Sequence, residues 1–217
     1  MSLAIFDLDN TLLAGDSDYL WGQFLCERGI VDAQVYEGEN ERFYKEYLSG
    51  SLDIYAFLAF QLRPLAQYDM ATLHDWHAQF MAEKIRPIIL PQARALLQKH
   101  RAQGDTLLII TATNRFITAP IAAEFGVEQL LATDLELCDG RYTGRVSGTP
   151  CFREGKVVRL REWLEQQAIS LKGSWFYSDS HNDLPLLQLI DHPVAVDADA
   201  ILAAHAERHG WPNMSLR

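Results

Sequence analysis

The chain has few cysteines and no excess of basic residues, and each of these features excludes a class of protein. Its three cysteines, Cys26, Cys138 and Cys151, are far apart in sequence and form no C-x-x-C pair. A disulfide scaffold is therefore not expected, and a reducing compartment fits best. Lysine and arginine number 19 against 29 aspartate and glutamate, a formal net charge of −10. This charge argues against nucleic acid, whose binding needs a basic face, and also against binding to anionic membrane surfaces.

Long apolar runs are also absent from the sequence. None approaches the roughly 20 residues that a membrane span needs. The apolar start of the chain is broken at Asp7 and has no basic region before it, so no signal peptide is expected. Together with the cysteine usage, this predicts a cytoplasmic protein without membrane insertion. An oligomer is possible, but no sequence feature indicates one.

Short apolar runs alternate with amphipathic stretches, and this pattern predicts an α/β fold with a mostly parallel sheet. Pro120 is expected to kink the helix that contains it or to reset its start. The expected elements are strand 3–8, helix 91–104, strand 105–113, helix 115–126, two strands within 130–146 joined at Asp139-Gly140, helix 154–167, strand 173–180, short helix 184–190 and a last strand 192–199.

Residues 16–84 differ in character from the rest of the chain. They are rich in tryptophan, tyrosine and phenylalanine, and their apolar positions recur at helical spacing. About four helices and no strands are expected there. A connection this long inside a compact domain is usually functional. We therefore expect a helical domain at 16–84 inserted into an α/β core made of residues 1–15 and 85–217.

Polar side chains follow three of the expected strands. In open parallel sheets, ligands bind beyond the carboxyl ends of the strands. Asp7 and Asp9 are two residues apart and share one face of an extended strand, where their charges repel unless a cation lies between them or one is protonated. The other polar residues at strand ends are Thr111, Thr113, Asn114, Ser178, Asp179, Asn182 and Asp183.

Four carboxylates at neighbouring strand ends, those of Asp7, Asp9, Asp179 and Asp183, make a hard oxygen site suited to Mg²⁺. Each also has a structural alternative, because Asp9 could form an Asx turn and the later pair could cap a helix. Asp183, which directly precedes helix 184–190, is expected to cap that helix as well as to serve the metal.

Positive charge near these acids would come from Lys156, at the start of helix 154–167. A lysine there could be a solvated surface residue, but beside four acids it is a counter-charge for a carboxylate and a transferring phosphate. Thr111 could be only a β-branched strand residue. At a strand end before a helix, its hydroxyl and the following main-chain N–H groups, beginning with Ala112, can hold phosphate oxygens.

These motifs, in this chain order, resemble those of the haloacid dehalogenase superfamily of phosphohydrolases. "DLDNT" at 7–11 matches its D-x-D-x-T motif, and Thr111 after "LLII" matches the motif of an apolar run followed by Ser or Thr. Lys156 matches its lysine motif, and "SDSHND" at 178–183 matches its acidic motif. The resemblance implies a Rossmann-like core, with the helical insert in the position of a type 1 cap.

The resemblance also implies roles for the matching residues. Asp7 would be the nucleophile that forms an aspartyl-phosphate, and Asp9 the general acid and then the general base. Phosphatases need an acid at the position of Asp9, which the dehalogenase branch lacks. The implied ligands of Mg²⁺ are Asp7, the main-chain carbonyl of Asp9, Asp179 and Asp183, and the implied phosphate-binding residues are Thr111, Ala112, Lys156 and Asn182.

The cap, the surroundings of the lysine and the Asp139-Gly140 turn resemble the branch that contains phosphoserine phosphatase. That branch also includes histidinol-phosphate phosphatases and small lipid phosphatases. Asp16 and Asp18 are expected to bind substrate in a pocket for a cationic amine with a ring nearby, although they could instead cap a helix. The cap aromatics could line this pocket or form the cap core; they are Trp21, Phe24, Tyr44, Tyr47 and Phe60.

The predicted function is thus Mg²⁺-dependent hydrolysis of a small phosphate monoester. Histidinol phosphate is the first expected substrate, because it carries an amine and an imidazole ring and no carboxylate. Phosphoserine is second, since Arg42, Arg63 and Arg86 could meet its carboxylate, but "TAT" at 111–113 disfavours it. A lipid phosphate is third, because no membrane segment is present. A non-catalytic binding module would have lost a catalytic group, and none is lost.

Overall fold

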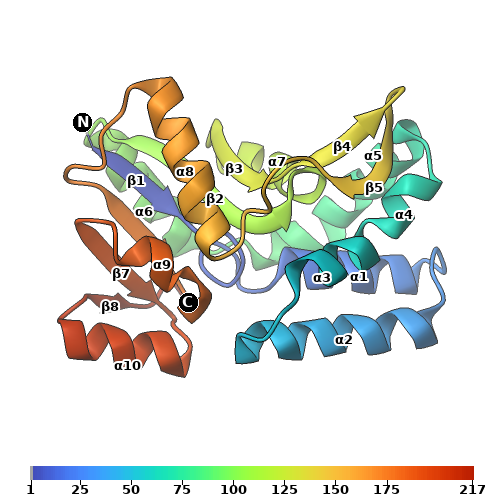
Figure 1. Cartoon of the computed structure of the whole chain (residues 1–217), viewed down its shortest axis with the longest axis horizontal. Helices are drawn as coiled ribbons and strands as arrows, with labels where there is room; N and C mark the ends of the chain where they lie inside the picture. The colour runs from blue at the N-terminus through green and yellow to red at the C-terminus, as the bar shows by residue number, and fades with distance from the viewer. Residues whose placement is uncertain (1) are drawn as a thin grey trace.

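A parallel sheet of six strands, in the order β3-β2-β1-β6-β7-β8, forms the centre of the core (Figure 1). The computed structural model describes residues 2–217. The strands are β1 (Leu3–Phe6), β2 (Thr106–Asn114), β3 (Gln129–Thr133), β6 (Trp175–Ser178), β7 (His192–Val196) and β8 (Asn213–Met214). This confirms the predicted α/β fold class with a parallel sheet.

Strand β1 lies in the middle of the sheet, between β2 and β6. Its four residues are fully buried, as expected for a strand that is covered on both faces. Ala4 and Phe6 belong to one hydrophobic cluster, and Leu3 and Ile5 to the other, because successive side chains point to opposite faces. The residues that follow β1 therefore emerge at the centre of the carboxyl edge of the sheet.

Helices cover both faces of the sheet. They are α6 (Pro91–Ala102), α7 (Arg115–Glu124), α8 (Glu154–Gln167), α9 (Leu184–Leu187) and α10 (Ala200–His209), with the short helix η3 (His181–Asp183) before α9. Leu160 and Trp163 of α8 pack with Leu186 of α9 and Leu202 of α10 on one face. None of the helices within residues 2–217 has the length and apolar character needed to cross a membrane.

The cap consists of helices only, as expected, and no strand lies within residues 16–84. It contains α1 (Ser17–Glu27), α2 (Ala33–Ser49), α3 (Ile54–Gln61), α4 (Arg63–Gln67), α5 (Met70–Phe80) and the turns η1 (Met81–Ile85) and η2 (Arg86–Ile88). Four of these helices begin after an aspartate whose side chain accepts from main-chain N–H groups of the first turn: Asp16, Asp32, Asp53 and Asp69.

A hairpin of β4 (Leu135–Cys138) and β5 (Arg141–Val146) lies against the cap helices α3 and α4 (Figure 1). Asp139 and Gly140 have φ of 50° and 74°, the left-handed conformation that an Asp-Gly hairpin turn requires. The segment before this turn, however, is two strands and not one. Strand β3 ends at Thr133, and the Asp134 carboxylate is held by Arg115 and Arg159 where the chain leaves the sheet.

The structure decides between two alternatives at Pro120 and corrects one further expectation about secondary structure. Of the two alternatives for Pro120, the structure excludes a reset of the helix start, because the Asn114 side chain accepts from the Ile117 N–H and caps α7 six residues before the proline. Strand β7 is also not the last strand, since α10 and the two-residue β8 follow it. A strand as short as β8 has no periodicity that a sequence pattern could reveal.

Candidate active site

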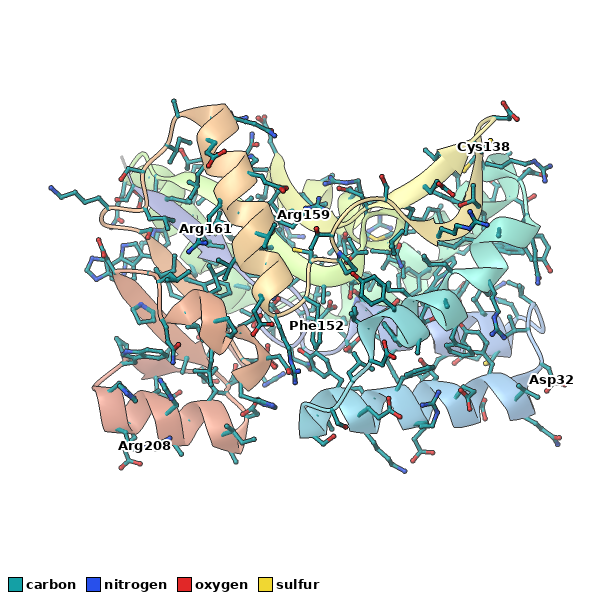
Figure 2. All side chains as sticks on the ribbon, viewed as in Figure 1. Asp32, Cys138, Phe152, Arg159, Arg161 and Arg208 are labelled. Atoms are coloured by element: carbon teal, nitrogen blue, oxygen red, sulfur yellow. The ribbon has the colours of Figure 1, made fainter. Side chains whose placement is uncertain are left out.

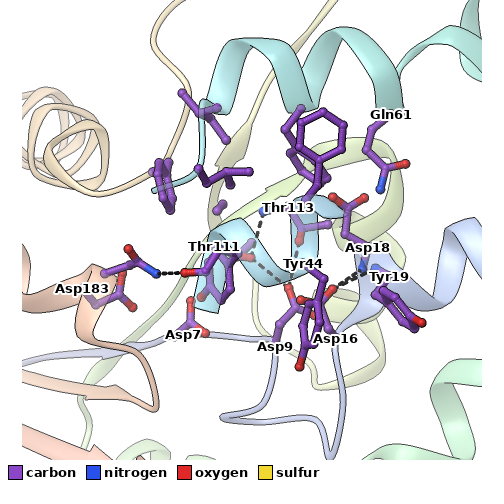
Figure 3. Close-up of a pocket in the computed structure, with 18 of the residues that line it drawn as sticks. Asp7, Asp9, Asp16, Asp18, Tyr19, Tyr44, Gln61, Thr111, Thr113 and Asp183 are labelled. Atoms are coloured by element: carbon purple, nitrogen blue, oxygen red, sulfur yellow. Dashed lines mark hydrogen bonds between the residues drawn. The ribbon is translucent and has the colours of Figure 1, made fainter. Parts of the chain in front are cut away.

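A pocket between the carboxyl edge of the sheet and the cap brings together most of the predicted site residues (Figure 3). Its lining includes Asp7, Asp9, Asp16, Asp18, Thr111, Ala112, Lys156, Asn182 and Asp183. Asp179 is the one predicted site residue outside this lining, and it lies close by, where its Oδ1 accepts from the Thr11 hydroxyl at 3.0 Å. Phe152, in the loop before α8, lies between the core and the cap (Figure 2).

Lys156 joins two of the acids at the base of the pocket. Its Nζ donates to Asp7 Oδ1 at 2.7 Å and lies 2.7 Å from Asp183 Oδ1, and all three residues are buried. Burial alone would lower the pKa of Lys156, but the carboxylates of Asp183 and Asp7 raise it above its ordinary value. The ammonium is therefore charged, and it ties α8 to the residue that follows β1 and to η3.

Asp183 does not cap α9, contrary to the expectation from its position. Its side chain makes no capping hydrogen bond, because the carboxylate is turned towards Lys156 and also accepts from the Ser178 hydroxyl at 2.7 Å. Ser180 caps η3 instead, by accepting from the Asn182 N–H. The ion pair with the buried ammonium thus determines where the Asp183 side chain points.

The base of the pocket carries more negative than positive charge. Burial raises the pKa of Asp7 to about 7, since Lys156 offsets only part of this effect. Burial, and then the carboxylates of Asp7 and Asp183, raise the pKa of Asp179 well above its ordinary value. Lys156 pairs with Asp7 and Asp183, and Asp179 adds a third carboxylate nearby. A divalent cation held by Asp7 and Asp179 would neutralise the remaining charge.

These residues fit a magnesium site that is open to substrate. Within residues 2–217, no group of three or more Asp, Glu, His or Cys side chains is placed where it could hold a metal ion. Mg²⁺ does not require one, because it is usually held by one or two carboxylates, several waters and the phosphate of the substrate. Asp7 and Asp179 can supply the carboxylates, and the main-chain carbonyl of Asp9 a further oxygen.

The Asp9 carboxylate is held on the cap side of Asp7. Its Oδ1 accepts from the Ser17 N–H at 2.6 Å, and its Oδ2 from the hydroxyls of Thr113 at 2.9 Å and Thr111 at 3.4 Å. Burial, and then the charge of Asp16, raise the pKa of Asp9 to about 6. Thr113 was expected only as a polar residue at a strand end, and its contact with Asp9 adds it to the site.

Asp16 and Asp18 both line the pocket, but only one of them caps α1. Asp16 Oδ1 accepts from the N–H groups of Asp18 and Tyr19, at 2.9 Å each. Asp18 lies inside the first turn of the helix, and its Oδ1 is buried without a hydrogen-bond partner among residues 2–217. The capping alternative is thus correct for Asp16 alone.

Asn182 connects the acidic motif to the cap. Its Nδ2 donates to the Tyr47 carbonyl at 3.1 Å, and its Oδ1 accepts from Arg153 Nε at 3.0 Å. Arg153 also donates to the Gly50 carbonyl at the end of α2. Sequence reasoning missed Arg153, and its position three residues before Lys156 was the available signal. The phosphate-binding role of Asn182 stays a prediction.

The cap aromatics divide between the pocket and the cap core. Tyr44 and Tyr47 line the pocket, whereas Trp21, Phe24 and Phe60 are buried in the hydrophobic core. Sequence reasoning missed several other lining residues, which have no local signal because they meet only when α2 and α3 pack: Asn40, Phe43, Phe57 and Gln61.

The three arginines considered for a substrate carboxylate lie outside this lining. Arg42 pairs with Glu39 and Glu46 along α2, and Arg86 pairs with Glu124. Arg63 is exposed. In the described part of the chain, Lys156 is thus the one lysine or arginine that lines the pocket.

A substitution at Gly155, next to Lys156, tests how tightly the start of α8 is packed. A Cβ there would lie 2.0 Å from the Pro150 carbonyl oxygen, so Gly155→Ala must displace the start of α8. We expect the free energy of unfolding to fall by about 1–3 kcal/mol and activity to fall with the displaced lysine. Gly38→Ala is the matched control, because a Cβ there meets nothing within 4 Å in α2; it should stabilise by about 0.5–1 kcal/mol. Equal stabilities in urea unfolding would contradict this account.

Comparisons with known proteins agree with the fold and the motifs. A family model described as haloacid dehalogenase-like hydrolase matches residues 4–188. A protein of Neisseria meningitidis serogroup C named histidinol-phosphatase is 49% identical, over 100% of this chain and 99% of that protein. A crystal structure of a Bordetella pertussis protein of unknown function has a TM-score of 0.94 and 44% identity, over 100% of this chain and 99% of that one.

A substrate-bound phosphoserine phosphatase structure has a TM-score of 0.72 and 18% identity, over 100% of this chain and 93% of that one. At this identity the likeness is one of fold, and it extends to the helical cap. The family model and the Neisseria relative cover most or all of the chain. The chain therefore belongs to the haloacid dehalogenase-like hydrolase family, as its four motifs predicted.

Proposed function

We propose that this phosphatase hydrolyses a small phosphate monoester that carries a positively charged amine, and that the substrate is histidinol phosphate. The charge of the pocket carries this proposal, because five aspartates and one lysine line it: Asp7, Asp9, Asp16, Asp18, Asp183 and Lys156. Lys156 and Mg²⁺ can neutralise the acids around the phosphate. The remaining acids, further into the cap, favour a cationic substrate group. The name of the 49% identical Neisseria relative supports the same substrate.

Asp7 is the proposed nucleophile. Lys156 holds its Oδ1 at 2.7 Å, which orients the carboxylate and leaves Oδ2 to attack phosphorus. The Asp7–phosphorus bond forms as the bond from phosphorus to the substrate oxygen breaks, giving an aspartyl-phosphate and an alcohol. Lys156, with Thr111 and the main chain at Ala112, would hold the phosphoryl oxygens during the transfer.

Asp9 is the proposed general acid and base. In its protonated form it gives a proton to the leaving oxygen, and the carboxylate then takes one from the water that hydrolyses the aspartyl-phosphate. A pKa of about 6, raised by burial, suits a group that must both give and take a proton near neutral pH. Its hydrogen bonds to Ser17 and Thr113 keep it fixed in both steps.

Asp7, Asp179, the carbonyl of Asp9 and, directly or through water, Asp183 would hold Mg²⁺. When bound, the ion supplies positive charge that lets a phosphate dianion approach the carboxylates. Asp16 would meet the substrate amine, since its Oδ1 is engaged in capping and its other oxygen is available. Asp7 and Asp16 are close enough for the charge of one to raise the pKa of the other, which suits an amine near the phosphate.

Phosphoserine is the weaker candidate because its carboxylate would enter an acidic pocket. The arginines that could have paired with it lie outside the pocket lining of the described chain. A carboxylate there would face Asp16 and Asp18 without a compensating cation. Histidinol phosphate has the same amine and no carboxylate.

A substrate panel with Mg²⁺ tests this proposal. We expect kcat/KM for histidinol phosphate of at least about 10⁴ M⁻¹s⁻¹, and at least about 100-fold above phosphoserine, a sugar phosphate and a lysophospholipid phosphate. The measurement is release of inorganic phosphate under initial-rate conditions. Equal, weak rates on all four compounds would agree with phosphate monoester hydrolysis but would exclude histidinol phosphate as the substrate.

A further inference from the structure

The cap side of the pocket contains a buried carboxylate without a partner. Asp18 is only 6% exposed, and its Oδ1 has no hydrogen-bond partner among residues 2–217. Burying a charged or polar oxygen without a hydrogen bond is costly. The side chain lines the pocket, and Figure 3 shows it directed towards Gln61. A ligand with an N–H group at this point would supply the missing bond.

A chain of hydrogen bonds fixes the orientation of the Gln61 amide. Asn40 Nδ2 lies 3.2 Å from the Tyr19 carbonyl, which can only accept, so Asn40 must present its nitrogen there and its oxygen to Gln61. Gln61 Nε2 donates to that oxygen at 3.3 Å, and Gln61 Oε1 accepts from the Tyr36 hydroxyl at 2.6 Å. The Gln61 nitrogen therefore faces the interior with one further N–H to donate.

Gly22 makes this arrangement possible. A Cβ at this position in α1 would lie 2.7 Å from Asn40 Nδ2 and 2.9 Å from Tyr36 Cε1. Only glycine lets α1 approach α2 closely enough for both side chains to reach Gln61. The hydrogen-bond chain is thus packed into the cap core, where Asn40, Gln61 and Tyr36 are all buried.

Apolar residues surround these two polar groups. Leu52, Ile54, Phe43 and Phe57 line the same pocket. They offer apolar surface to a ring, and the two phenylalanines can stack against it. A neutral imidazole has one N–H donor and one acceptor nitrogen, which lie in the plane of the ring on either side of one carbon and point in different directions. Asp18 as acceptor and Gln61 as donor, pointing towards one another (Figure 3), match that pattern.

We propose that Asp18 and Gln61 bind the imidazole ring of the substrate, with Asp18 accepting from one ring nitrogen and Gln61 donating to the other. This rests on the proposed function. The order of the acids also matches the substrate, because Asp7, Asp16 and Asp18 follow one another from the sheet edge into the cap (Figure 3). The phosphate, the amine and the ring follow one another in the same order in histidinol phosphate.

Phenylalaninol phosphate isolates the ring nitrogens, because it has the same phosphate, amine and chain length with a phenyl ring. We expect the wild-type enzyme to favour histidinol phosphate over it by about 100-fold or more in kcat/KM, since a site built for hydrogen bonds rejects a ligand that cannot make them. In Asp18→Asn, the preference should fall to about 10-fold or less. Gln61→Met, which removes the amide donor, should reduce it in the same direction.

Asp32→Asn is the matched control. Asp32 caps α2 at the end that lies away from the core (Figure 2), and asparagine also caps helices, so this variant should keep the full preference. Thermal unfolding of each variant establishes that it is folded. The inference would be overturned if folded Asp18→Asn and Gln61→Met kept the full preference for histidinol phosphate over phenylalaninol phosphate. It would also be overturned if the wild-type enzyme hydrolysed these two compounds at equal rates. A wild-type preference for phosphoserine over both would instead overturn the proposed function.

Discussion

Asp7→Asn is expected to reduce kcat for histidinol phosphate by at least about 10⁴-fold, the scale found when a catalytic nucleophile is removed. The amide nitrogen cannot attack phosphorus, so no aspartyl-phosphate forms. The fold should persist, because asparagine has the same shape, its oxygen can still accept from Lys156, and the Lys156–Asp183 ion pair remains. Single-turnover phosphate release and intact-protein mass after a rapid acid quench measure the two steps directly.

Asp75→Asn is the matched control for this substitution. Asp75 is exposed on α5 in the cap, so the same chemical change there should leave turnover and thermal unfolding as in the wild type. Mass analysis of Asp7→Asn before and after the assay excludes conversion back to aspartate. Turnover above about 1% of wild type in a sample with intact asparagine would refute the aspartyl-phosphate mechanism.

Removal of divalent metal with EDTA is expected to lower activity by at least about 10³-fold, and Mg²⁺ should restore it. The physical reason is the excess negative charge at the base of the pocket, where Lys156 pairs with Asp7 and Asp183 and Asp179 adds a third carboxylate. Added Mg²⁺ should also raise the unfolding temperature of the EDTA-treated protein, because an ion that binds the folded state stabilises it. Asp179→Asn should require more Mg²⁺ for half-maximal activity and gain less stability from it.

The metal requirement should depend on pH in a defined direction. Burial raises the pKa of Asp7 to about 7 in the metal-free site. Most of the Asp7 carboxyl groups are therefore protonated at pH 6, and few are at pH 8. Metal binding must displace this proton. The Mg²⁺ concentration for half-maximal activity should therefore be several-fold higher at pH 6 than at pH 8. Full activity in EDTA at both pH values would exclude the metal site.

Sequence alone was sufficient for the parts of the molecule that depend on local patterns. The buried run before Asp7 predicted β1, and the Asp139-Gly140 pair predicted the hairpin turn, because each needs only neighbouring residues. The four motifs also predicted which side chains meet at the sheet edge. Parallel strands bring their carboxyl ends to one edge, so residues as distant as Asp9 and Thr111 were placed together correctly.

Tertiary packing decided what the local patterns left open. The Asp183 side chain binds Lys156 and does not cap a helix, because an ion pair with a buried ammonium is stronger than a capping hydrogen bond. Asp16, and not Asp18, caps α1. The donor orientation of Gln61 depends on groups from α1 and α2, whose approach is set by packing at Gly22. Motifs and periodicity predict which reactive side chains lie at a strand end, because these depend on residues that are neighbours in the sequence. The partners of a buried polar side chain come from distant segments, and only the packed structure determines them.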